Sequence, residues 1–229
     1  MIASADDFAG VTGDRAIRDK LATYIERLLE RNAKLNLTGA RDRPSALEHV
    51  RDSLTLRDWI AAPHVDIGSG GGFPAIPLAI ATGIPMTLIE STAKKATFLR
   101  EIVRELELPI DVLAVRAEEA GRTPALRGTF ASATARAVGP LPVVLELALP
   151  LLAVGGIAIL QRGRFEAGER RATADALLVL GGDLTNEVVP DDPADERRVI
   201  FVRKMLPTNQ RFPRRPGIPA KRPLCSADG

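Results

Sequence analysis

The chain has 229 residues, of which 45% are hydrophobic and 26% are charged, values typical of a globular protein with one large domain. A disulfide framework and a cysteine-based metal site are excluded because Cys225 is the single cysteine, and with only two histidines no metal site is expected. No basic-then-apolar leader follows Met1, so we expect a cytoplasmic protein without a membrane segment.

Charge is distributed unevenly along the chain. Residues 197–229 contain nine lysines and arginines and one acid, a net charge of +8, which leaves −6 on the rest. A basic segment on an acidic body is typical of proteins that bind polyanions, although such a segment can also serve solubility alone. Residues 212–223 contain four prolines and predict an extended arm that is neither a helix nor a central strand.

The N-terminal part predicts two helices joined by a turn. Apolar residues recur at helical spacing over residues 14–35, where Asp14 or Thr12 can cap the start. A turn at residues 36–39 follows, and then a helix over residues 45–60. No symmetric apolar surface is evident, so we expect a monomer.

From residue 64 onward strands and helices alternate. Short apolar runs predict strands at residues 64–67, 86–89, 110–115, 130–135 and 157–160. Helices are expected at residues 77–82, 93–106, 142–152 and 169–180, and a late edge strand at 199–204. The apolar run 140–160 is interpreted as a buried helix, a turn at Gly155-Gly156 and a buried strand, because prolines and glycines interrupt it.

This alternation predicts the α/β class, with a doubly wound, mostly parallel sheet. We divide the chain into an N-terminal helical extension (1–62), a Rossmann-like core (63–206) and a basic, proline-rich tail (207–229).

A glycine-rich loop directly after the first predicted strand is the most informative segment. The dinucleotide fingerprint fails here because Phe73 stands where its third glycine belongs. The observed pattern is Asp66-x-Gly68-x-Gly70-x-Gly72, which resembles the first motif of Rossmann-like methyltransferases that bind S-adenosylmethionine. At the end of the second strand, the Glu90 carboxylate can accept both ribose hydroxyls; the alternative is a solvated strand cap.

Several further blocks make the chain similar to the bacterial small-subunit rRNA methyltransferase G family. The most specific block is residues 66–78, in which Phe73-Pro74 and Ile76-Pro77-Leu78 follow the glycine loop. The other matching blocks are Asn36-Leu37-Thr38, residues 49–53, Glu90-Ser91, residues 116–119, Arg136-Ala137, Arg162-Gly163 and parts of the tail. Departures are Ala131, where members often carry aspartate, and Arg162, where they often carry lysine.

The resemblance implies methyl transfer from S-adenosylmethionine to N7 of guanine 527 in 16S rRNA. It implies that Gly68 and Phe73 line the cofactor pocket and that Ala117 and Glu118 meet the adenine. Arg136 would lie beside the cofactor and the incoming base. Our candidates for RNA contacts are Asn36, Arg41, His49, Arg162, Arg211, Arg214, Arg215, Lys221 and Arg222. Each of these also has a plain structural interpretation as a turn, packing or surface residue.

The residues present are compatible with this reaction. Guanine N7 has a free lone pair and no proton to remove, so catalysis requires alignment rather than a general base. A guanidinium at Arg136 can donate to guanine O6, which makes it our candidate for positioning the base. Cytosine C5 chemistry is excluded because the core contains no cysteine nucleophile.

Three other functions remain open from the sequence. A methyltransferase that acts on a small molecule would keep the fold and the cofactor but leave the basic tail unexplained. A non-catalytic RNA-binding or ribosome-assembly protein would not need the glycine loop, Glu90 and Arg136. A nicotinamide-dependent dehydrogenase is disfavoured by Phe73.

Overall fold

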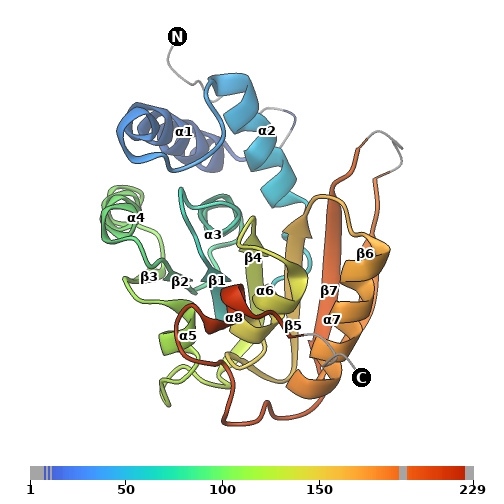
Figure 1. Cartoon of the computed structure of the whole chain (residues 1–229). Coiled ribbons are helices and arrows are strands. Elements are labelled where there is room, and N and C mark those ends of the chain that lie inside the picture. The colour runs from blue at the N-terminus through green and yellow to red at the C-terminus, as the bar shows by residue number, and fades with distance from the viewer. Residues whose placement is uncertain (1–7, 9, 11, 191–194, 225–229) are drawn as a thin grey trace.

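A seven-stranded sheet runs through the middle of the structure (Figure 1). The computed structural model describes residues 8, 10, 12–190 and 195–224, so residues 225–229 of the predicted tail, including Cys225, lie outside the described residues. The strands are β1 (His64–Ile67), β2 (Met86–Ile89), β3 (Ile110–Leu113), β4 (Phe130–Arg136), β5 (Leu152–Arg162), β6 (Gly182–Val188) and β7 (Arg198–Lys204). Their order is β3-β2-β1-β4-β5-β7-β6, with β1 to β5 mutually parallel and β7 antiparallel to both neighbours.

Helices cover both faces of this sheet and bury a separate apolar core on each. One core contains buried residues of α1 (Arg15–Leu35), α2 (Arg43–Leu54), α3 (Ala75–Thr82) and α4 (Ala93–Glu105). The other contains those of α5 (Ala117–Ala120), α6 (Leu141–Ala148) and α7 (Ala167–Leu180). This arrangement confirms the predicted α/β class and doubly wound sheet. None of the described helices is both long and apolar enough to cross a membrane.

One prediction about the late strands was wrong, and one strand was not predicted. The strand expected at the edge, β7, lies inside the sheet, and the edge strand is β6, for which no strand was predicted. The sequence of β6, Gly-Asp-Leu-Thr-Asn-Glu-Val, is rich in weak strand formers, and most of its residues stay partly exposed. Pairing with β7 therefore decides its conformation, and local preference does not.

The predicted helix at 142–152 was too long, and the predicted turn at Gly155-Gly156 was wrong. The helix α6 ends at Ala148, and β5 already begins at Leu152 and runs through both glycines. The ladder between β4 and β5 is irregular there. A Cβ atom at Gly156 would lie 3.0 Å from the carbonyl oxygen of Ala131, so the glycine permits close approach of the strands.

The two N-terminal helices begin at capping carboxylates. Asp14 accepts hydrogen bonds from the first turn of α1, as predicted, and Asp42 forms a capping box with Ser45 at the start of α2. The helix α2 ends at Leu54, earlier than the predicted end at residue 60. At the end of α1, Asn36 adopts a left-handed conformation with φ of 50°.

The tail packs onto the face that carries α6 and includes a short helix, α8 (Ile218–Lys221) (Figure 1). The expectation of a purely extended arm was therefore wrong. The helix tolerates Pro219 because it lies in the first turn, where a backbone N–H has no helical partner. Arg127 fastens the preceding segment by donating to the carbonyl oxygens of Thr208 and Phe212, both within 2.8 Å.

Candidate functional site

A cleft of about 1320 Å³ opens where β1 and β4 lie side by side and the strand order reverses. In doubly wound sheets this is the place where ligands bind, at the carboxyl ends of the strands. The glycine loop, the 36–39 turn, α2 and the ends of β4 and β5 all contribute lining residues. Among the residues predicted for the site, the lining includes Asn36, His49, Gly68, Gly70, Phe73, Arg136 and Arg162.

The backbone conformation of the loop after β1 requires glycine at three positions. Gly68, Gly70 and Gly72 all have positive φ, a conformation that side chains with a Cβ rarely adopt. At Gly72 an added Cβ would lie 2.5 Å from the Ile76 side chain, so space is also lacking. From α1, the buried Tyr24 hydroxyl donates to the carbonyl oxygen of Gly71 at 2.8 Å and fixes the loop against the N-terminal helices.

Glu90 stabilises the same loop from the end of β2. One carboxylate oxygen accepts from the backbone N–H of Gly70 at 2.8 Å, and the other accepts from the N–H of Thr92 at 2.7 Å. The side chain is buried, so the solvated-cap interpretation does not describe it. Its predicted contact with ribose hydroxyls stays a prediction.

Asp66 is buried at the end of β1 with one oxygen that has no partner among the described residues. Its Oδ1 accepts from the Thr134 hydroxyl at 2.7 Å, whereas its Oδ2 is unpaired. The same Thr134 hydroxyl lies 2.9 Å from Nε2 of His64, whose Nδ1 lies 2.7 Å from the Ser132 hydroxyl. Burial raises the pKa of Asp66 to about 6 and lowers that of His64 to about 3.

These opposite shifts predict opposite pH dependences for two variants of the cofactor-free protein. Between about pH 4 and 6 the native pair holds one proton, on Asp66, and the unfolded chain also holds one, on the histidine. In Asp66→Asn only His64 titrates, and the unfolded chain binds one proton more than the native state. The free energy of unfolding should therefore increase, relative to wild type, by about 1.4 kcal/mol for each unit by which the pH rises. In His64→Gln only Asp66 titrates, and its raised pKa makes the native state bind one proton more than the unfolded chain. The free energy of unfolding should therefore decrease as the pH rises, with a slope of similar size.

Urea unfolding at pH 4, 5 and 6 measures both slopes. Parallel stability curves for the wild type and the two variants would contradict the assignment of the buried proton to Asp66.

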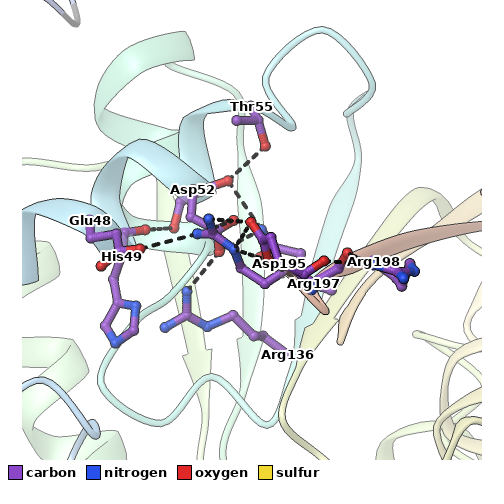
Figure 2. A network of polar contacts seen from close by, with 10 residues as sticks. Glu48, His49, Asp52, Thr55, Arg136, Asp195, Arg197 and Arg198 are labelled. Carbon is purple, nitrogen blue, oxygen red and sulfur yellow. Dashed lines mark hydrogen bonds and ion pairs between the residues drawn. The ribbon is translucent and has the colours of Figure 1, made fainter. Parts of the chain in front are cut away.

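Arg136, at the end of β4, lines the cleft, and Figure 2 shows its side chain next to Asp52. Its guanidinium carbon lies 5.1 Å from the centre of the Phe73 ring, and the rings of Tyr24 and His49 meet Phe73 edge-on. Burial lowers the pKa of Arg136 from its usual value, and the carboxylate of Asp52 opposes this shift. The guanidinium is thus held in place and mostly desolvated.

Figure 2 shows Asp52 of α2 among Thr55, Arg136 and Arg197. Its Oδ2 accepts from Arg136 Nη1 at 3.3 Å, while Arg197 Nη1 lies 3.9 Å from Oδ1. Arg197 also pairs with Asp195 at 2.6 Å. Neither Asp52 nor Arg197 was predicted as a site residue, although Asp52 belongs to the family block at residues 49–53.

The other predicted RNA contacts divide into cleft and surface positions. Arg162 lines the cleft, but Glu169 holds its guanidinium through two hydrogen bonds of 2.8 and 2.5 Å. Arg41 is exposed and outside the cleft lining. No described tail residue lines the cleft: Arg214 is paired with Glu146, and the remaining candidates, Arg211, Arg215, Lys221 and Arg222, are exposed.

The two residues predicted to meet the adenine lie on the short helix α5. Glu118 is buried, and its Oε1 accepts from the backbone N–H of Gly217 in the tail at 2.8 Å. On the same side, a Cβ at Gly121 would lie 2.9 Å from Pro213. The tail therefore supports the segment to which the resemblance assigns the adenine, and the roles of Ala117 and Glu118 stay predictions.

Solved structures share this fold. An O-methyltransferase from Bacillus cereus in complex with SAH superimposes with a TM-score of 0.58 at 19% identity, over 89% of this chain and all of that one. A geranyl diphosphate methyltransferase in complex with SAM gives a TM-score of 0.58 at 15% identity, over 71% of this chain and 88% of that one. At these identities the likeness establishes the fold alone.

Sequence comparisons are more specific. The ribosomal RNA small subunit methyltransferase G of Chloroflexus aggregans is 46% identical over 208 residues, which cover 88% of this chain and 87% of that protein. The protein of the same name from Pelotomaculum thermopropionicum is 38% identical over 88% of each chain. The family profile described as rRNA small subunit methyltransferase G matches residues 17–200. The chain belongs to the rRNA small subunit methyltransferase G family.

Proposed function

We propose that the protein transfers a methyl group from S-adenosylmethionine to N7 of guanine 527 in 16S rRNA, within the small ribosomal subunit or a precursor of it in the cytoplasm. The observation that carries this proposal is the juxtaposition of a glycine loop, a buried unpaired carboxylate oxygen on Asp66 and the desolvated guanidinium of Arg136. Membership of the family supports the RNA substrate.

The residues around the glycine loop fit the cofactor. S-adenosylmethionine carries positive charge on its sulfonium and its amino group, and the unpaired Oδ2 of Asp66 is an acceptor suited to such a cation. Gly68 and Gly70 let the backbone approach the ligand, and Glu90 keeps the loop in shape. When bound, the cofactor supplies an electrophilic methyl carbon, and the adjacent cleft has room for a nucleobase.

The protein then has to hold the base so that N7 faces that carbon. Guanine N7 needs no general base, because its in-plane lone pair is free. His49 is the histidine in the cleft lining, and burial together with Arg136 lowers its pKa from the usual value. Alignment by Arg136 and the walls of the cleft is therefore the contribution that we assign to the protein.

Methyl transfer from labelled S-adenosylmethionine tests this function. We expect label in 16S rRNA or small-subunit particles from cells that lack the modification, and no label in an extract of small metabolites. Label in a metabolite and none in RNA would replace the proposal by the small-molecule alternative. Binding of the rRNA without any transfer would favour the non-catalytic alternative.

A further inference from the structure

Two side chains from neighbouring strands converge on one carboxylate in the wall of the cleft. Arg136 on β4 and Gln161 on β5 are partners in the parallel ladder, so their side chains lie on the same face of the sheet. The Oδ2 of Asp52, on α2, accepts from Arg136 Nη1 at 3.3 Å and from Gln161 Nε2 at 3.1 Å. Figure 2 shows the contact between Asp52 and Arg136. A helix from the N-terminal part of the chain thus meets two strands of the sheet at a single oxygen.

Gln161 holds Asp52 in place. Its Nε2 also donates to the backbone carbonyl oxygen of Asp52 at 3.1 Å, so one amide group binds both the main chain and the side chain of that residue. Both partners are acceptors, and only the nitrogen of the buried amide can donate to them. The carboxylate therefore faces Arg136 in a defined position.

Asp52 is the one carboxylate that pairs with Arg136 among the described residues. The side chains of Arg136 and Asp52 are 17% and 24% exposed, so solvent screens this pair less than a surface pair. The ring of Phe73 provides a second contact, with its centre 5.1 Å from the guanidinium carbon. Loss of Asp52 would leave a mostly buried cation without its ion pair, and the long side chain could then adopt other rotamers.

The backbone next to Arg136 is also held in an unusual conformation. Ala137 has a φ of 55°, in the left-handed region that residues with a Cβ rarely adopt. Such a conformation persists only where the surrounding structure over-determines it, and it recurs at sites that must keep their shape. Both the main chain and the side chain at the end of β4 are therefore constrained.

We propose that Asp52 is a positioning residue for methyl transfer: it holds the Arg136 guanidinium in the orientation that aligns the substrate base, and Gln161 in turn holds Asp52. The proposal rests on the proposed function, because Asp52 acts only through Arg136. It also means that α2, which lies outside the Rossmann-like core, contributes to the catalytic site.

The effect of this positioning belongs to the chemical step. A guanidinium that is oriented in advance needs no reorganisation when the base is aligned with the methyl carbon. Without the carboxylate of Asp52, Arg136 can still reach the base but spends less time in the productive orientation. The loss should therefore appear in kcat more than in KM for the particles. The dissociation constant of S-adenosylmethionine should stay within about threefold of wild type.

A double-mutant cycle tests whether Asp52 acts through Arg136. The single-turnover rate constant at saturating S-adenosylmethionine and small-subunit particles is measured for wild type, both single variants and the double variant. Asp52→Ala should lose about tenfold, the value of a charge-assisted hydrogen bond, and Arg136→Ala about 100-fold. The double variant should then match Arg136→Ala within about twofold, whereas independent contributions would multiply to about 1000-fold.

A conservative variant and a matched control complete the experiment. Asp52→Asn keeps the shape and one acceptor oxygen, so it should lose only about fivefold, and this loss should also shrink to within about twofold in the Arg136→Ala background. It therefore gives the same test if Asp52→Ala fails to fold. The control Glu101→Ala removes a carboxylate from the ion pair with Arg31, which joins α4 to α1 outside the cleft lining, and should keep the wild-type rate constant.

Losses that multiply in the double variants would overturn this proposal alone, because Asp52 would then act independently of Arg136. A wild-type rate constant in both Asp52 variants would overturn it as well. No transfer by wild type to the RNA of the particles would instead overturn the proposed function, and this proposal with it.

Discussion

Replacement of Arg136 by alanine is expected to lower kcat for rRNA methylation by about 100-fold. The guanidinium is mostly buried beside Phe73 and Asp52, and it is the donor that we assign to guanine O6. Without it the base loses alignment with the methyl carbon, and misplacement by about 1 Å can cost about 10²-fold. Single-turnover methylation of small-subunit particles measures this loss.

Binding of S-adenosylmethionine to Arg136→Ala distinguishes a loss of base positioning from a loss of the structure of the whole site. S-adenosylmethionine should bind to Arg136→Ala with a dissociation constant within about tenfold of wild type. Arg136→Lys keeps a positive charge but not the planar fork, so we expect partial recovery at most. Arg104→Ala, at an exposed position on α4 outside the cleft lining, should behave as wild type. Unchanged turnover in Arg136→Ala would contradict its role.

Replacement of Arg214 by alanine is expected to destabilise the fold by about 3–5 kcal/mol, because it leaves a buried carboxylate without its positively charged partner. Glu146, on α6, is fully buried and receives three hydrogen bonds of 2.6–3.1 Å from the Arg214 side chain and one of 2.8 Å from its backbone N–H. Arg214 also donates to the carbonyl oxygen of Arg222 at 2.7 Å. Urea unfolding at neutral pH measures the change.

The adjacent residue provides the matched control. Arg215 is exposed, so Arg215→Ala removes the same charge from the same segment and should change stability by less than about 0.5 kcal/mol. If both arginines served only as phosphate contacts, the two variants would have equal stability and an equally reduced salt dependence of RNA binding. That result would contradict the structural role of Arg214.

The sequence predicted the parts of the fold that local patterns encode. Strands β1 and β2 were predicted with their observed bounds, because short apolar runs between turn residues specify them. The glycine loop was also predicted, because its conformation needs glycine at Gly68, Gly70 and Gly72 whatever lies around it. Tertiary pairing decided the rest, as in the polar strand β6 and the tail helix around Pro219.

The same division holds for the site. Phe73 and Arg136 were found through motifs, whereas the contacts of Asp52 join residues 84 and 109 positions apart in the chain. No local pattern in the sequence predicts such contacts. A glutamine in an apolar strand, such as Gln161, predicts only that its amide needs hydrogen-bond partners, and not which residues they are. The position of Arg214 could not be predicted for a related reason: the composition of the tail gives its charge, but Glu146, a single acid in an apolar helix, decides where Arg214 lies.

The most direct test of the account is to locate the methyl group that the purified protein adds to unmethylated 16S rRNA in small-subunit particles. Borohydride reduction followed by aniline cleavage cuts the chain at N7-methylguanine. We predict one new cleavage, at guanine 527, which depends on S-adenosylmethionine and is lost in Arg136→Ala. Labelled RNA without cleavage at that position would contradict N7 of this guanine as the target, and with it the role assigned to Arg136.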